Sequence, residues 1–190
     1  MAKVFIMYFS GTGNNAKMAE AVAEGVRRVD GATVQLHGIQ GSEIVEGRFV
    51  NEAILDEMDK ADAIIFGSPT FMGSISSQFK AFADATSARW PEQRWANKLA
   101  AGFSVSANLS GDKLNALLDM GLLAAQHGML WVNLDIPGGI DKQGRNRLGS
   151  QYGVAGQTAV EPLPESDLET GRYMGERVAK LAQQFIRGAK

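Results

Sequence analysis

The chain has 190 residues, 45% of them hydrophobic and 21% charged, with a formal net charge of -2, two histidines and no cysteine. This size predicts one domain that spans residues 1–190, and the small net charge argues against a nucleic-acid partner. The missing cysteines exclude disulfides, thiolate catalysis and iron–sulfur ligation, and two histidines offer little to a metal. The chain starts directly with a strand pattern and has no apolar run of membrane-spanning length, so we expect a cytoplasmic protein without a signal peptide or membrane contact.

The first predicted element is a buried strand at residues 4–9, followed by a helix that ends at Asp30 and Gly31. A turn between a strand and a helix N-terminus aims several main-chain N–H groups, and the positive end of the helix dipole, at one point. Hydroxyl and amide side chains add donors there. We therefore predict a phosphate-binding loop formed by Ser10, Gly11, Thr12, Gly13, Asn14 and Asn15.

The loop alone does not identify the class of nucleotide that carries the phosphate, because Gly11, Gly13 and Ala16 also fit the spacing of a dinucleotide fingerprint. That fingerprint needs an acidic residue about 20 positions further on. The second predicted strand, at residues 33–37, is followed by no acid before Glu43. The interleaved hydroxyls favour the terminal phosphate of a mononucleotide, with a dinucleotide or a simple glycine turn as alternatives.

Strand and helix patterns then alternate along the chain. Further strands are expected at 62–67, 99–105 and 129–134, and helices near 50–59, 75–82, 114–125 and 166–187. This alternation predicts an α/β protein with an open parallel sheet, wound on both faces. The apolar positions of the fourth helix are Leu114, Leu117, Leu118, Leu122 and Ala125. Residues 137–164 form a long loop that we expect to be functional or an interface arm, with a possible return strand at 152–155.

The loop after the third strand carries two large apolar residues, Phe71 and Met72, at a sheet edge where core residues are not expected. We predict that they cover the face of a flat ligand, while Pro69 shapes the loop, Gly73 turns it and Thr70 hydrogen-bonds. The alternative is that Phe71 and Met72 pack under a neighbouring loop or in a subunit contact.

The loop after the fourth strand is polar and lies at the same predicted edge, where open α/β sheets bind ligands. Its main-chain and side-chain groups suit the polar edge of a ring, and the residues concerned are Ser104, Val105, Ser106, Ala107, Asn108, Leu109 and Ser110. A phosphate loop beside a flat-ring site with a hydrogen-bonding rim predicts FMN.

The residues also carry a family resemblance. The loop from Ser10 to Asn14 resembles the phosphate loop of flavodoxins, and the chain is similar over nearly its full length to the WrbA-type NAD(P)H:quinone oxidoreductases. The matching stretches are residues 63–70, Trp90, residues 127–129, residues 152–156 and residues 165–176. The resemblance implies a flavodoxin-like, doubly wound five-stranded parallel sheet of order 2-1-3-4-5. It also implies FMN as cofactor, NAD(P)H as co-substrate, a quinone as acceptor, and assembly into a homo-tetramer.

In that family a Trp and a His line the substrate pocket over the flavin, which implies such roles for Trp90 and His127. From position alone, His127 is a surface cap at a helix C-terminus and Trp90 is a packing residue. Phe71 stands where the family has an Arg, so a charge is missing from the implied nicotinamide and quinone pocket. Lys142, Arg145 and Arg147 on the long loop could meet a cofactor phosphate, but a solvated charge run is favoured.

Two functions stay open at this point. The first is an FMN enzyme that takes a hydride from NAD(P)H and reduces a quinone in a ping-pong cycle. The second is a flavodoxin-type carrier, or flavin-binding module, without its own small-molecule substrate. The family-like Trp90 and His127 and the long loop favour the enzyme, whereas Phe71 and the Thr12 loop favour the carrier.

Overall fold

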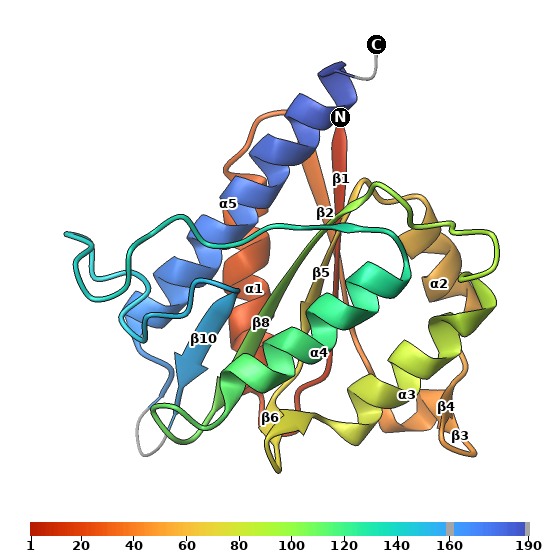
Figure 1. Ribbon diagram of the computed structural model, residues 1–190, viewed down its shortest axis with the longest axis horizontal. Coiled ribbons are helices and arrows are strands. Elements are labelled where there is room, and N and C mark those ends of the chain that lie inside the picture. The colour runs from red at the N-terminus through yellow and green to blue at the C-terminus, as the bar shows by residue number, and fades with distance from the viewer. Residues whose placement is uncertain (159–161, 189–190) are drawn as a thin grey trace.

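The computed structural model describes residues 1–158 and 162–188 (Figure 1). Residues 159–161, which belong to the predicted loop at 137–164, lie outside the described part. The helices are α1 (Asn14–Arg27), α2 (Glu52–Asp59), α3 (Ser77–Ala85), α4 (Lys113–Gln126) and α5 (Glu165–Gly188). The strands are β1 (Ala2–Tyr8), β2 (Ala32–Gly38), β3 (Ile44–Val45), β4 (Arg48–Phe49), β5 (Ala63–Gly67), β6 (Thr70–Phe71), β7 (Ser74–Ile75), β8 (Leu99–Ser106), β9 (Leu130–Trp131) and β10 (Val154–Gln157).

The main sheet has the order β10-β8-β5-β1-β2, and every pair in it is parallel. Counted along the chain, this is the predicted order 2-1-3-4-5, so the flavodoxin-like fold is confirmed. The small hairpins β3–β4 and β6–β7 lie outside this sheet.

The fifth strand is divided, unlike the continuous strand predicted at residues 129–134. β9 pairs with Leu99 and Ala100 at the start of β8, while β10 pairs with residues 103–106 at its end. The chain leaves the sheet because the next free amide, that of Leu134, donates to the carbonyl of Gln151 (2.9 Å) rather than to β8. The predicted return strand near 152–155 therefore supplies the second half of the sheet edge, as β10.

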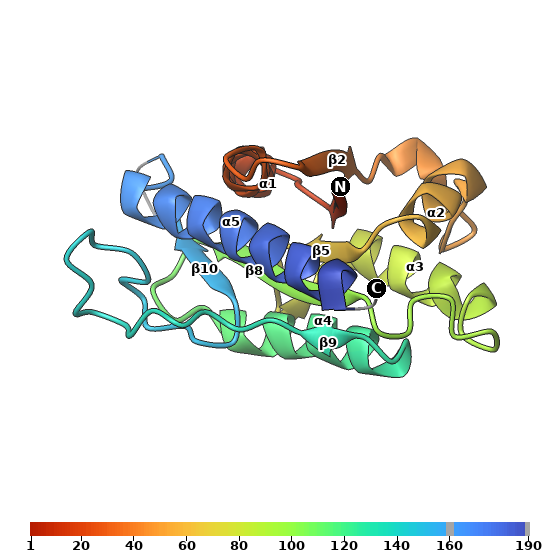
Figure 2. The same cartoon turned by 90° about the horizontal axis from the view of Figure 1, so that it is seen from above.

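Helices cover both faces of the sheet (Figure 2). Side chains alternate along a strand, so Val4 and Ile6 of β1 join the core under α1 and α5. Phe5 and Met7 join the second core, under α2, α3 and α4. The sheet is thus buried on both faces, as its continuous apolar strands predict.

A glycine in each helix allows α5 to pack closely against α1. A Cβ on Gly175 would lie 1.9 Å from the carbonyl oxygen of Val22, and one on Gly25 would lie 1.8 Å from that of Arg172. These approaches leave no room for any side chain, so both positions require glycine.

The leucines of α4 do not all face the core. Of the five predicted apolar positions only Leu117 is buried, whereas Leu114, Leu118 and Leu122 are exposed by 57%, 40% and 63%. Small residues and one flexible side chain lie against the sheet instead: Ala116, Met120, Gly121 and Ala124. α4 therefore presents a row of leucines to the outside.

In the described ranges, no helix is both long enough and apolar enough to pass through a membrane.

Candidate functional site

Three loops meet at the carboxyl edge of the sheet, which is the lower edge in Figure 1. They follow β1, β5 and β8, and the register places Tyr8 beside Gly67 and Gly67 beside Phe103. Because these three strands are neighbours, the loops that leave them form one continuous rim, as predicted from the sequence.

The first loop, residues 10–13, has the geometry of an anion site. The hydroxyl of Ser10 accepts a hydrogen bond from the amide of Ala16 (3.1 Å) and so fixes the loop over the start of α1. Gly13 has φ +85, a left-handed conformation that glycine adopts without strain. Within the described part of the chain, the main-chain N–H groups of residues 11–15 donate to no protein acceptor. Their donors, and the helix dipole behind them, can therefore serve a phosphate.

Asn15 contributes differently from the predicted amide donor. Its side chain is 3% exposed, and it accepts from the amide of Val105 (3.2 Å) and donates to the Val105 carbonyl (3.5 Å). The side chain thus ties the first loop to β8, and only the main-chain N–H of Asn15 stays open toward a ligand. The Asn14 amide donates to the Thr12 hydroxyl (3.3 Å) at the exposed face of the loop.

The second loop ends in the β6–β7 hairpin, which is fixed at both ends. Thr70 and the buried Ser104 share a hydroxyl hydrogen bond (2.8 Å), and the amide of Asn115 donates to the Gly73 carbonyl (2.8 Å). Pro69 is buried behind them. The Ser104 hydroxyl is therefore bonded to the hairpin. The sequence analysis had instead predicted that it meets the polar edge of a ring.

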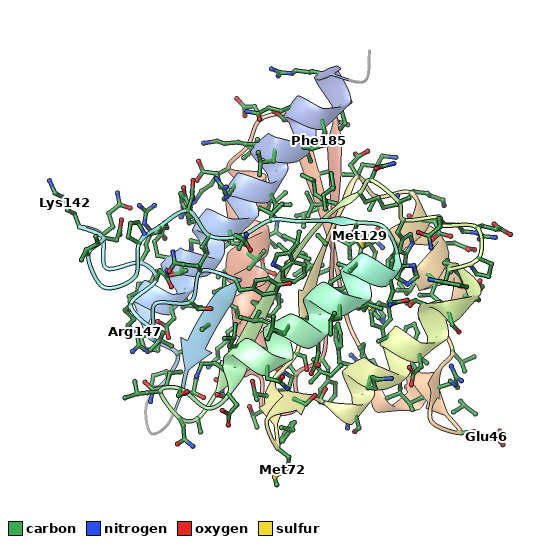
Figure 3. All side chains as sticks on the ribbon, in the orientation of Figure 1. Glu46, Met72, Met129, Lys142, Arg147 and Phe185 are labelled. Carbon is green, nitrogen blue, oxygen red and sulfur yellow. The ribbon has the colours of Figure 1, made fainter. Side chains whose placement is uncertain are left out.

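Phe71 and Met72 form the tip of this hairpin and are exposed by 54% and 103%. Met72 projects from the lower edge of the molecule (Figure 3). The alternative that these two residues pack under a neighbouring loop of the same chain is therefore wrong. Both side chains can meet a ligand or another molecule.

The third loop contains a residue that the sequence analysis missed. Ala107, Asn108, Leu109 and Ser110 are exposed, but Lys113 beneath them is only 3% exposed. Its Nζ donates to the Asn108 carbonyl (2.6 Å), the Leu109 carbonyl (3.0 Å) and the Ser106 hydroxyl (3.2 Å). Gly111 and Asp112, both at φ +53, turn the chain back over this side chain. A Gly-Asp pair before a helix is the sequence signal that could have revealed this turn.

His127 and Trp90 are not brought to these loops. α4 has 14 residues, a length of about 21 Å at about 1.5 Å per residue, and His127 lies at the end opposite the third loop. His127 and the half-exposed Trp90 line a cavity of about 560 Å³ between α3 and α4, together with Asp84, Asp119 and Leu122. Within one chain, the predicted substrate residues and the predicted phosphate loop are therefore separate.

The hydrogen bonds of His127 determine which ring nitrogen carries a proton. Nε2 lies 2.8 Å from the Thr86 hydroxyl, and that hydroxyl already donates its proton to the Ala83 carbonyl (2.7 Å). Nε2 must therefore carry a proton and donate it, which leaves Nδ1 bare, buried and without a partner in the described part of the chain. Burial lowers the pKa of His127 against a weaker opposing effect of Asp59. The surface cap expected from position alone is wrong, because His127 is 2% exposed and its one N–H already donates to Thr86.

The long loop keeps its arginines paired within the protein. Arg147 makes a two-pronged ion pair with the buried Asp167 (2.7 and 2.8 Å), and Arg145 pairs with Asp141 (2.9 Å). Lys142 points away from the molecule (Figure 3). Neither arginine is therefore free to bind a cofactor phosphate. The two arginines are also not the solvated charges that the sequence analysis favoured, because each is paired with a carboxylate.

The comparisons with known proteins agree with this geometry. Residues 3–134 match the protein family described as NADPH-dependent FMN reductase. Flavodoxin FldP of Pseudomonas aeruginosa is 39% identical over 193 residues, which cover 97% of this chain and 99% of that protein. An NAD(P)H dehydrogenase (quinone) of Archaeoglobus fulgidus is 36% identical over 199 residues, covering 97% of this chain and 100% of that protein.

Solved structures show the same likeness. A WrbA-like flavodoxin from Agrobacterium tumefaciens superposes with a TM-score of 0.77 at 42% identity, covering 97% of this chain and 99% of that one. A flavodoxin from the domain Archaea gives a TM-score of 0.65 at 22% identity over 95% of this chain and 99% of that one, a likeness of fold alone.

Proposed function

The chain belongs to the NADPH-dependent FMN reductase family, which confirms the family resemblance found in the sequence, and from this premise we propose that it is an FMN-dependent NAD(P)H:quinone oxidoreductase. The observation that carries the proposal is the set of open N–H groups at residues 11–15, beside two further loops at the same sheet edge. When bound, FMN would take a hydride from NAD(P)H and pass two electrons to a quinone in a ping-pong cycle.

The residues present fit FMN in two parts. The main-chain N–H groups of residues 11–15 and the hydroxyl of Thr12 would hold the phosphate, and Asn15 would keep this loop in place through Val105. Phe71 and Met72 would cover one face of the ring system and exclude water from it. The outward main-chain groups of residues 106–110 would meet its polar edge.

We further propose that the active form is a homo-oligomer, and specifically a tetramer. The leucine row of α4, made of Leu114, Leu118 and Leu122, is an apolar surface at helical spacing that another subunit would cover. Trp90 and His127 lie beside that row, and the length of α4 separates His127 from the loop after β8. The cavity that they line would therefore face a neighbour's flavin rather than their own.

A second candidate is an electron carrier. One of the relatives is named a flavodoxin, and Phe71 brings no charge to the rim for a nicotinamide phosphate. In this alternative the same loops hold FMN, while the exposed hairpin tip at Phe71 and Met72 meets a protein partner.

Two measurements test these proposals. Titration of the purified chain with FMN should quench flavin fluorescence, and a chain that leaves flavin fluorescence unchanged is not an FMN protein. Anaerobic mixing of the FMN form with NADH or NADPH should bleach the flavin within the time of one turnover, and added quinone should restore its colour. Slow or absent bleaching in an FMN-binding preparation would select the carrier.

A further inference from the structure

Lys113 is an ammonium group buried beneath an exposed loop. Its three donors match three acceptors, the Ser106 hydroxyl and the carbonyls of Asn108 and Leu109, all in the loop after β8. A side chain of this kind is seldom 3% exposed unless it is paired. Here all three partners are neutral.

No carboxylate contacts this ammonium in the described residues. The nearest acidic group that acts on it is Asp167, and both oxygens of that carboxylate are bound by Arg147. In the described residues the charge of Lys113 is therefore paired with no carboxylate, and it is met by the dipoles of the loop and by the longer-range attraction of Asp167. Burial lowers the pKa of Lys113, as expected for an ammonium without an acidic partner.

The two carbonyl contacts also set the direction of two N–H groups. In a planar trans peptide, the N–H of one residue points opposite to the carbonyl of the residue before it. Because the carbonyls of Asn108 and Leu109 point inward to Lys113, the N–H groups of Leu109 and Ser110 point outward. Within the described part of the chain these two N–H groups donate to no protein acceptor.

We propose that Lys113 is a positioning residue of the flavin site, an inference that rests on the proposed function. By drawing the carbonyls of Asn108 and Leu109 inward, it presents the N–H groups of Leu109 and Ser110 as a fixed pair of donors for the carbonyl-bearing edge of the FMN ring. Its positive charge, which no carboxylate contacts in the described residues, favours the reduced, more negative flavin over the oxidised one. The residue therefore sets both the affinity and the reduction potential of the cofactor.

The test compares Lys113→Met with a matched control, Lys98→Met. Lys98 also directs its Nζ at two main-chain carbonyls, those of Asp59 (2.8 Å) and Ala61, and burial also lowers its pKa. It lies next to the start of β8, at the opposite edge of the sheet from Lys113. Both variants are first checked by thermal denaturation, and FMN affinity and midpoint potential are then measured for each and for the parent chain.

We expect Lys113→Met to weaken FMN binding about ten- to a hundredfold, the effect of losing the two neutral hydrogen bonds from Leu109 and Ser110 to the ring edge. We expect the reduced flavin to lose about tenfold more affinity than the oxidised one, which makes the two-electron potential about 30 mV more negative. Lys98→Met should leave the affinity within a few-fold and the potential unchanged. Equal values in Lys113→Met and the parent, or equal losses in both variants, would overturn the proposal.

Lys113→Gln separates charge from geometry and replaces the methionine variant if that chain does not fold. Its amide keeps two donors, so we expect most of the affinity to remain while the potential still falls. A potential equal to that of the parent would show that the charge has no role at the flavin. If the parent chain itself does not bind FMN, the proposed function fails and the role of Lys113 fails with it. Tight binding by all chains at one potential overturns the Lys113 inference alone.

Discussion

Nε2 of His127 donates a hydrogen bond to the Thr86 hydroxyl (2.8 Å), and that hydroxyl donates a hydrogen bond to the Ala83 carbonyl. These hydrogen bonds place a proton on Nε2, and the second ring nitrogen, Nδ1, is buried without a partner in the described residues. A proton on that nitrogen would be a buried, unpaired charge. The folded chain therefore resists protonation of His127.

The first prediction follows for stability against pH. The pKa of His127 is lowered in the folded chain, whereas in the unfolded chain it is about 6.5. Below that pH the unfolded chain binds a proton at His127 and the folded chain does not. The free energy of unfolding therefore falls as pH falls, by at most about 1.4 kcal/mol per pH unit. Chemical denaturation between pH 8 and pH 5 should show this loss, and His127→Gln should show less of it. Parallel curves for the two chains would contradict the assignment.

The second prediction concerns Gly13→Val. The φ of +85 at Gly13 is unfavourable for valine by roughly 1–2 kcal/mol, and the valine side chain would project into the open space beside the phosphate loop that the phosphate of FMN would need. Each donor that is lost from a charged ligand costs on the order of 1–3 kcal/mol. We expect FMN binding to fall by at least about a hundredfold in a fluorescence titration.

Gly47→Val is the control for backbone strain. Gly47 has φ +78 and, like Gly13, has no atom within 4 Å of an added Cβ, but it lies in the β3–β4 hairpin. It should lose stability and keep its affinity for FMN. Equal losses of affinity in both variants would show that Gly13 acts through stability alone.

The third prediction tests the leucine row of α4. Replacing Leu118 and Leu122 together by Glu places two like charges, one turn apart, on the surface that we propose to be buried between subunits. Light scattering should show the parent as an oligomer and the variant as a species near 20.4 kDa. Phe185→Glu is the matched control, because Phe185 is an exposed apolar residue (51%) near the end of α5, away from α4 (Figure 3). An FMN-bound parent at 20.4 kDa would contradict the oligomer.

The sequence was sufficient for features that depend on local pattern. Apolar runs alternating with helical patterns predicted the parallel sheet, and the glycines after β1 predicted the loop at the start of α1. The sequence could not predict which face of α4 is buried, because the helix has two apolar faces and both repeat with the helical period. At Gly121 an added Cβ would lie 2.1 Å from the Tyr152 hydroxyl oxygen, so packing against distant residues decides which face of α4 is buried.

The role of Lys113 was hidden for a related reason. A lysine at the start of a helix reads as a solvated charge, and its burial depends on the left-handed turn at Gly111 and Asp112. The division of the fifth strand depends likewise on a contact between distant residues, the hydrogen bond from Leu134 to Gln151. Features created by tertiary contacts of this kind leave little trace in the local sequence.

The last prediction concerns Phe71, at the position where the family resemblance implies an Arg. An Arg can bind a cofactor phosphate or a quinone oxygen, whereas a phenyl ring can only stack on a flat ligand. The lost charge-assisted hydrogen bond is worth roughly 1.5–3 kcal/mol, and stacking returns about 0.5–1.5 kcal/mol for aromatic ligands only. We therefore expect weak binding of NAD(P)H, little preference for NADPH, and better turnover with polycyclic quinones.

Phe71→Arg should then lower the apparent KM for NAD(P)H about tenfold and leave FMN affinity within a few-fold. Phe71 is half exposed at the hairpin, so the longer side chain can be accommodated without disturbing the core. Met72→Arg adds the same charge one residue further on, at a fully exposed position with φ +46. It should change KM much less, because a solvated charge at the tip is screened by salt. Equal effects of the two variants would indicate long-range attraction, and no effect of either would mean that Phe71 does not face the nicotinamide.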